Sequence, residues 1–489
     1  MFASEPRVLL VCPPPPESHA AGPRVKPELV SVWSESRRRG CAVDVLDLDV
    51  ELGGSPPIGR RRSDGHLGQG GRRSAELIGE RQADLAAIAC LSPLQFGAAL
   101  AIARVIREAH PNTVIAVFGQ HPTVRPDDFA AGAAEGLFDR VVRGEAEVSL
   151  AEMAAEAAAS GREATACRVG DGGPLPLDAA SVPDYAKYPY VQPGLPALGV
   201  YLSRGCQYHS AICYAGPGGG VWRAYPADVA FDLLAGLDAL QPAELEVLDP
   251  TFGQDSGWRR HLLDKLAGIE RRRVPLSLTV RPDEFTRADI DAVYGGRIHL
   301  HFNLGTLSPT LLAALEVAQP GRRLERALDL LRYANAKGVP AEIDLVFGQP
   351  GETRQTAAET LDALSALIES FPNTSFRLAA VPWAYFPASS PEVDIEAPAR
   401  RFGARIESPE WWKDPQPSLE SAQAVVPSSD LADLPAGDDA YWRPRFVEIR
   451  EAFAAKLTSA ARSGLRSHES VGSAAADVPH GFWREPRWH

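Results

Sequence analysis

The chain has 489 residues, of which 45% are hydrophobic and 23% are charged, and its formal net charge is -13. At roughly 100 to 200 residues per domain, this length predicts two or three domains and leaves room for a buried active site. The acidic balance and the short, scattered basic runs argue against a nucleic-acid partner, and no apolar run reaches the roughly 18 residues that a membrane span needs.

The N-terminus and the cysteines indicate where the protein works. The opening MFASEPRVLLVCPPPP leads directly into an apolar run and lacks the basic and apolar regions of a signal peptide. Six cysteines in a chain of this length fit a reducing compartment better than a disulfide framework. We therefore expect a cytoplasmic protein with no membrane partner.

Residues 1–160 alternate short apolar runs with segments of helical pattern. Runs rich in Val, Ile and Leu are typical of parallel strands that helices cover on both faces. The expected strands are 7–12, 43–50, 84–91, 113–119 and 140–144. The sequence thus predicts a doubly wound, Rossmann-like α/β domain, in which a ligand binds beyond the carboxyl ends of the strands.

Residues 161–195 are rich in Pro, Gly and Asp and are predicted to be a linker. Six further strand and helix units follow in residues 196–385 and predict a partial (β/α)6 barrel, smaller than the TIM-like form with eight units. The expected strands are 199–203, 244–248, 276–280, 298–303, 341–347 and 376–381. Residues 386–489 lose this period and are interpreted as a covering C-terminal extension, with one helical run near 447–461 and a tail that is either disordered or docked.

The segment SRGCQYHSAICYAGP follows the first predicted barrel strand. It resembles the SRGC-x3-C-x2-C loop of radical S-adenosylmethionine (SAM) enzymes, whose cysteines hold a 4Fe-4S cluster that binds SAM. Cys206 and Cys213 match the first and third ligands, but Ser210 stands at the second. A serine hydroxyl is a poor substitute for a thiolate on cluster iron, so we expect no stable cluster. His209 is an alternative ligand, although an ordinary role as a polar loop residue is favoured.

Further segments resemble the same family in the same order. LEVLDPTFGQD and LSLTVRPDEF match its second and third barrel strands, and DLVFGQPGET matches the turn after its fifth strand. In HFNLGTLSP, Asn303 stands where many relatives carry Glu, so the residues that face SAM differ as well. The resemblance assigns the SAM side of the pocket to Tyr214, Asn303, Gly348, Gly351 and Glu352.

The first domain resembles the cobalamin-binding domain that precedes many such barrels. The match covers most of residues 84–153 and includes a VRGEAE turn similar to the family's VRGEGE. The resemblance places cobalamin near Ser92, Pro93, Gly119, Gln120, His121, Arg143, Gly144 and Glu145. His19 has the spacing of a lower cobalt ligand in other cobalamin domains, but the interpretation as an exposed loop residue is preferred.

The resemblance implies an enzyme that uses cobalamin and SAM to tailor a small-molecule or peptide natural product, most often by methyl transfer. A radical mechanism would also need an external reductant. Two alternatives remain open: an enzyme that keeps cobalamin and SAM but works without the cluster by polar chemistry, and a non-catalytic cobalamin or SAM sensor or partner subunit. The sequence does not identify the substrate.

Overall fold

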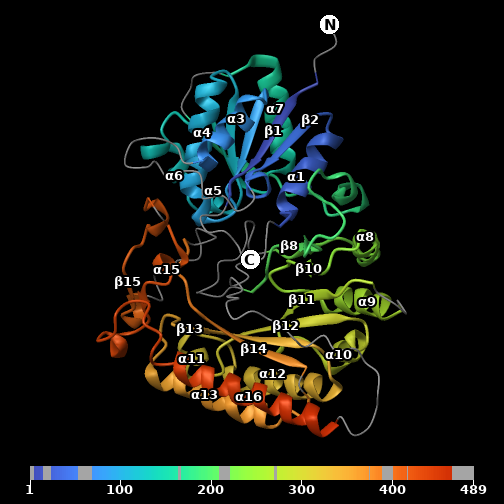
Figure 1. Ribbon diagram of the computed structural model, residues 1–489, viewed down its shortest axis with the longest axis vertical. Coiled ribbons are helices and arrows are strands. Elements are labelled where there is room, and N and C mark those ends of the chain that lie inside the picture. The colour runs from blue at the N-terminus through green and yellow to red at the C-terminus, as the bar shows by residue number, and fades with distance from the viewer. Residues whose placement is uncertain are drawn as a thin grey trace.

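The computed structural model describes residues 5–14, 24–52, 69–162, 167–208, 221–268, 273–373, 375–387, 400–415 and 417–464. In the described part of the chain, two parallel sheets of six strands each lie one beyond the other along the longest axis of the molecule (Figure 1). Among the described residues, no helix has both the length and the apolar character to cross a membrane.

The first sheet is a doubly wound domain with the strand order β2-β1-β3-β4-β5-β6, all parallel. Its strands are β1 (Arg7–Cys12), β2 (Ala42–Asp47), β3 (Leu85–Ala89), β4 (Val114–Phe118), β5 (Arg140–Gly144) and β6 (Arg168–Gly172). The helices are α1 (Pro27–Arg38), α2 (Leu48–Glu51), α3 (Gln69–Gly79), α4 (Phe96–Ala109), α5 (Gln120–Val124), α6 (Asp127–Ala130) and α7 (Glu147–Ser160), with 3-10 turns at η1 (Pro93–Gln95) and η2 (Gly132–Ala134). Alternate residues of β1 pack on opposite faces, Leu10 in the core that includes α1 and α7 and Leu9 in the core that includes α3 and α4.

The five strands predicted for this domain are confirmed, although residues 48–50, predicted as the end of the second strand, belong to helix α2. The sixth strand, β6, was not predicted. Its residues lie in the segment 161–195 that the sequence indicated to be a linker, and they pair in parallel with β5. The sequence of β6, RVGDG, is mostly exposed and has one apolar side chain, Val169. Because this edge strand is held by its backbone and not by a buried face, it leaves no apolar run in the sequence. The linker interpretation was therefore wrong for these residues.

The second sheet has the strand order β14-β13-β12-β11-β10-β7, also all parallel, and β7 and β14 are its two edges. Its strands are β7 (Leu198–Val200), β10 (Leu245–Val247), β11 (Leu276–Val280), β12 (Ile298–Gly305), β13 (Ala341–Phe347) and β14 (Phe376–Pro382). The helices are α8 (Ala227–Ala239), α9 (Ser256–Ala267), α10 (Arg287–Val293), α11 (Pro309–Ala314), α12 (Pro320–Lys337) and α13 (Arg354–Glu369), and 3-10 turns η3 (Ala179–Ser181) and η4 (Tyr185–Lys187) precede β7. The six predicted barrel strands are confirmed.

The C-terminal extension contacts both domains. It contains β15 (Arg405–Ile406), η5 (Trp411–Lys413), α15 (Leu419–Ala422), β16 (Val425–Val426), η6 (Ser429–Leu431) and α16 (Arg443–Gly464), which confirms the predicted helical run. Trp442 stacks on Phe347 of β13 with ring centroids 4.4 Å apart. Trp412 lies in the core that contains Phe129 of the first domain and donates a hydrogen bond to Asp128 at 2.8 Å. The extension therefore packs against the barrel and the first domain together. The exact domain boundaries stay a prediction.

Candidate functional site

The carboxyl ends of the strands in the first domain lie on the side that faces the second sheet (Figure 1). Ser92 follows β3 and caps η1, whose first residue is Pro93, by accepting a hydrogen bond from the Leu94 amide at 3.3 Å. Gly119 follows β4 with φ of 115°, and a Cβ atom there would lie 2.7 Å from the Cys90 carbonyl oxygen. Only glycine fits this close approach of two strand ends. These positions form one edge of small residues.

His121 lies deeper than the resemblance suggested. Its ring has no exposed surface and packs edge-on against Phe96, Phe129 and Trp412, with centroids 5.4 to 5.5 Å apart. Burial lowers the pKa of His121 even though Asp128 lies 3.3 Å away, so the imidazole is neutral at pH 7. Gln120, at the start of α5, is also buried. A contact between His121 and a ligand stays a prediction, and its burial beneath the extension does not favour it.

The turn after β5 joins the two domains. Glu145 accepts a hydrogen bond from the Leu175 amide at 2.7 Å and forms an ion pair with Arg223. Two residues later, Glu147 accepts hydrogen bonds from Ser31 and from Arg204, each at 2.8 Å. Arg204 and Arg223 belong to the two strands of one antiparallel hairpin, β8 (Ser203–Arg204) and β9 (Arg223–Ala224). We call these two ion pairs the interdomain clamp.

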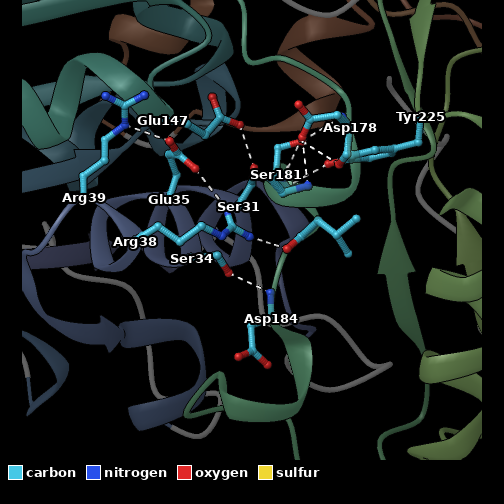
Figure 2. Close-up of polar contacts among 12 residues, drawn as sticks. Ser31, Ser34, Glu35, Arg38, Arg39, Glu147, Asp178, Ser181, Asp184 and Tyr225 are labelled. Carbon is cyan, nitrogen blue, oxygen red and sulfur yellow. Dashed lines mark hydrogen bonds and ion pairs between the residues drawn. The ribbon is translucent and has the colours of Figure 1, made fainter.

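The Glu147–Arg204 pair of the clamp is ionic at neutral pH. Burial alone would raise the pKa of Glu147, but the Arg204 guanidinium and the Ser31 hydroxyl hold it below its usual value. Figure 2 shows Glu147 next to Ser31 on α1, and it also shows how α1 holds the segment before the barrel. Ser34 accepts a hydrogen bond from the Asp184 amide at 2.8 Å. The chain between the domains is thus fixed to the first domain on the side where the clamp lies.

The hairpin flanks the loop that carries the cysteine motif. Cys206 is 6% exposed and follows Gly205, whose φ is 78°. Ahead of the loop, the buried carboxylate of Asp249 accepts hydrogen bonds from the amides of Leu202 at 2.8 Å and Ser203 at 3.1 Å. Burial raises the pKa of Asp249 to about 6. The DPTF segment therefore shapes the entry to the loop.

Two further contacts hold the start of the loop. The Gln207 amide donates to Gln254 Oε1 at 2.9 Å, and the Arg281 guanidinium lies 4.2 Å from the centre of the Tyr208 ring. The segments that resembled the second and third barrel strands thus both contact the cysteine loop. The remaining predicted residues of this region, Ser210, Cys213 and Tyr214, and also His209 and His19, lie outside the described residues.

A buried carboxylate holds the turn after β13 by hydrogen bonds. Glu352 is fully buried, and its Oε2 accepts hydrogen bonds from the Gly348 amide and, at 2.8 Å, from the Tyr441 hydroxyl. Burial raises the pKa of Glu352 to about 7. At Gly351, a Cβ atom would lie 3.1 Å from the Phe402 ring. This turn is therefore closed by the C-terminal extension, while Asn303 on β12 is exposed at a shift in strand register.

Solved structures share this arrangement. TsrM from Kitasatospora setae, a radical SAM methyltransferase whose structure contains cobalamin and a [4Fe-4S] cluster, matches with a TM-score of 0.60 at 18% identity over 80% of this chain and 77% of that chain. OxsB, a cobalamin-dependent SAM radical enzyme with aqua-cobalamin bound, matches with a TM-score of 0.58 at 14% identity over 81% of this chain and 55% of that chain. This chain has the fold of the cobalamin-dependent radical SAM enzymes. No protein-family model matches the sequence, and neither does a curated protein.

Within this fold, the residues present fit two of the three implied groups. At the cobalamin edge, Gly144 has φ of 76° and no side chain to keep a corrin away from the backbone, while the Arg143 Nε lies 3.4 Å from Asp171 Oδ1 in an ion pair. Beside the start of the cysteine loop, the buried Nε2 of Gln254 has no hydrogen-bond partner among the described residues. The unpaired Gln254 donor fits a polar ligand. A [4Fe-4S] cluster does not fit, because the motif supplies two thiolates and a hydroxyl.

Of the clamp residues, the sequence indicated Glu145, as a residue near cobalamin, but it did not indicate Glu147, Arg204 or Arg223. Arg204 and Arg223 precede and follow the cysteine loop, and Glu147 lies two residues after Glu145 in the turn. The sequence did show two acidic residues after the predicted strand 140–144 and two basic residues on either side of the cysteine motif. That signal does not say which charges meet, because the answer depends on how the two domains dock.

Proposed function

We propose that this chain is an enzyme that binds cobalamin between its two domains and tailors a small-molecule or peptide natural product by methyl transfer. The interdomain clamp carries the proposal, because it ties the turn at the cobalamin edge to the hairpin that flanks the cysteine loop. The fold supports it: TsrM is a methyltransferase that has been solved with a tryptophan substrate, and OxsB has been solved with aqua-cobalamin and SAM.

Cobalamin, when bound, supplies a cobalt ion that carries and donates a methyl group. Ser92, Gly119 and Gly144 would offer small side chains and backbone at the edge where the corrin lies. Glu145 and Glu147 would act through Arg223 and Arg204 to hold the barrel loop at a set distance from that edge. Gly348, Gly351 and Asn303 would border SAM on the barrel side.

A second candidate mechanism is favoured by Ser210. Since the motif does not supply three thiolates for a cluster, polar methyl transfer without a radical is the competing reaction. A polar route needs no external reductant. A cobalamin or SAM sensor is the non-catalytic alternative, and it differs from both enzymes in one observable, because a sensor turns over no metabolite when it is supplied with cobalamin and SAM.

The experiment is reconstitution with hydroxocobalamin, desalting, and measurement of the corrin absorbance that stays with the protein. The wild-type protein should retain about one cobalamin per chain. Ser92→Trp should retain far less, because the new side chain occupies the edge where the corrin would lie. Gln82→Trp is the matched control, since exposed Gln82 lies three residues before β3 begins, beyond the end of the strand opposite to Ser92. A wild-type protein without corrin absorbance, or equal retention by the two tryptophan variants, contradicts the proposal.

A further inference from the structure

The inner face of the partial barrel carries polar side chains at the level of β12 and β13. In β13 the residues alternate, with Ile343 and Leu345 buried in the core and Glu342 and Asp344 on the other face. Parallel pairing sets Glu342 beside His301 of β12, and Asp344 beside Asn303. Two carboxylates and an imidazole thus meet on one face of neighbouring strands.

These three side chains form a cluster with the chemistry of a metal site. One ligand atom from each of His301, Glu342 and Asp344 lies within 4.8 Å of the other two. His301 is 6% exposed, and its Nδ1 is 3.6 Å from Glu342 Oε1, beyond hydrogen-bond distance. A buried imidazole so close to carboxylates needs a hydrogen bond or a cation to offset the loss of water.

Thr279 gives an independent indication of a ligand. It lies on β11 directly beside His301 in the strand register, and it is 8% exposed. Its hydroxyl Oγ1 is buried and has no hydrogen-bond partner among the described residues. Buried hydroxyls are normally paired, so an unpaired one next to the cluster indicates that a polar ligand or its water shell belongs there.

We infer that His301, Glu342 and Asp344 bind a divalent metal ion inside the barrel. Imidazole with carboxylate oxygens suits Mn²⁺, Fe²⁺ and Zn²⁺, and metal bonds of about 2.0 to 2.2 Å require the three side chains to close in around the ion. Three protein ligands leave coordination positions open in a six-coordinate ion. Asn303 lies beside Asp344, further along β12 toward its carboxyl end, and a substrate oxygen or water could complete the shell.

This site is separate from the cysteine loop. The loop follows β7, and β10 and β11 stand between β7 and β12 in the sheet. The inference therefore goes beyond the proposed function and does not depend on cobalamin or on a cluster. Its test uses no cobalamin, so a failure of one proposal leaves the other measurable.

The experiment is a titration of the metal-free full chain with Mn²⁺, in which EPR counts the free ion. Wild type should bind about one Mn²⁺ per chain. His301→Ala, Glu342→Gln and Asp344→Asn should each weaken binding by roughly tenfold or more, since even loss of an outer partner of a metal ligand has an effect of that size. His299→Ala is the matched control, because His299 lies on the same strand and face, two residues before His301, and should bind as wild type does.

Two results would overturn the inference. One is the absence of bound Mn²⁺ and, in a parallel equilibrium dialysis, of bound Zn²⁺ in wild type, a result that needs no variant to fold. The other is unchanged binding by Glu342→Gln and Asp344→Asn, with circular dichroism showing that both are folded. Loss of binding in His299→Ala to the same degree as in His301→Ala would place the ion elsewhere and would also contradict the assignment.

Discussion

Replacing Glu147 by Gln should loosen the hairpin that flanks the cysteine loop. The side chains of Glu147 and Arg204 are 3% and 18% exposed, and their charged atoms are 2.8 Å apart. Breaking a buried ion pair by removing one partner costs about 3 to 5 kcal/mol. The glutamine amide would still accept a hydrogen bond, and Arg204 also interacts with Glu145, so we expect a smaller effect of about 2 kcal/mol.

The effect should appear as faster hydrogen exchange in the hairpin. The Tyr225 amide donates to the Leu202 carbonyl at 3.0 Å, so its exchange reports opening of β8 from β9. At 1.36 kcal/mol per factor of ten, a change of about 2 kcal/mol corresponds to roughly 30-fold faster exchange. Mass spectrometry of peptides from this hairpin measures it. Glu156→Gln is the control, since Glu156 is an exposed residue of the same helix, α7.

The reasoning would be refuted by equal exchange in Glu147→Gln and Glu156→Gln. It would also be refuted if Arg204→Gln and Glu147→Gln had fully additive effects in the double variant, because residues that form one pair do not act independently. The pH dependence of the hairpin's protection against exchange is a further test. Since the folded pKa of Glu147 lies below its ordinary value, the protection should be complete above about pH 4.5 and should be lost as the pH falls further.

Three other predictions concern the iron-sulfur cluster, the C-terminal extension and the turn after β13. After anaerobic reconstitution, wild type should hold fewer than four irons per chain and Ser210→Cys should gain iron; a full cluster in wild type, with 5'-deoxyadenosine released from SAM, would contradict this. Truncation after residue 385 should cost solubility by removing the cover that Trp412 and Trp442 provide, and a soluble fragment that binds cobalamin would show that the cover is dispensable. The folded pKa of Glu352 is about 7, above its usual value, so its contribution to stability should fall as the pH rises from about 4.5 through 7. Thermal unfolding of Glu352→Gln should lack that part of the pH dependence, and an unchanged profile would count against it.

The strands were predictable because buried parallel strands appear in the sequence as continuous runs of apolar residues. Leu85–Ala89 and Val114–Phe118 are buried at every residue, and their apolar runs predict both strands. β6 was missed because backbone hydrogen bonds hold it at an edge, and backbone groups leave no trace in residue type. For His121, the sequence predicted the position in the chain but not the burial of the side chain. Its place after β4 was correct, but its burial depends on Trp412, far away in the chain.

The sequence by itself determined the order of the two α/β units and the cysteine motif with Ser210 in it, because hydrophobic periodicity and ligand spacing are local properties of the chain. Only the tertiary structure decided which charges meet. The pairing of Glu147 with Arg204 requires the first domain to dock on the barrel, and the meeting of His301 with Glu342 requires two parallel strands in one register. Such contacts depend on the packing of whole elements against one another, and no local pattern encodes their distance.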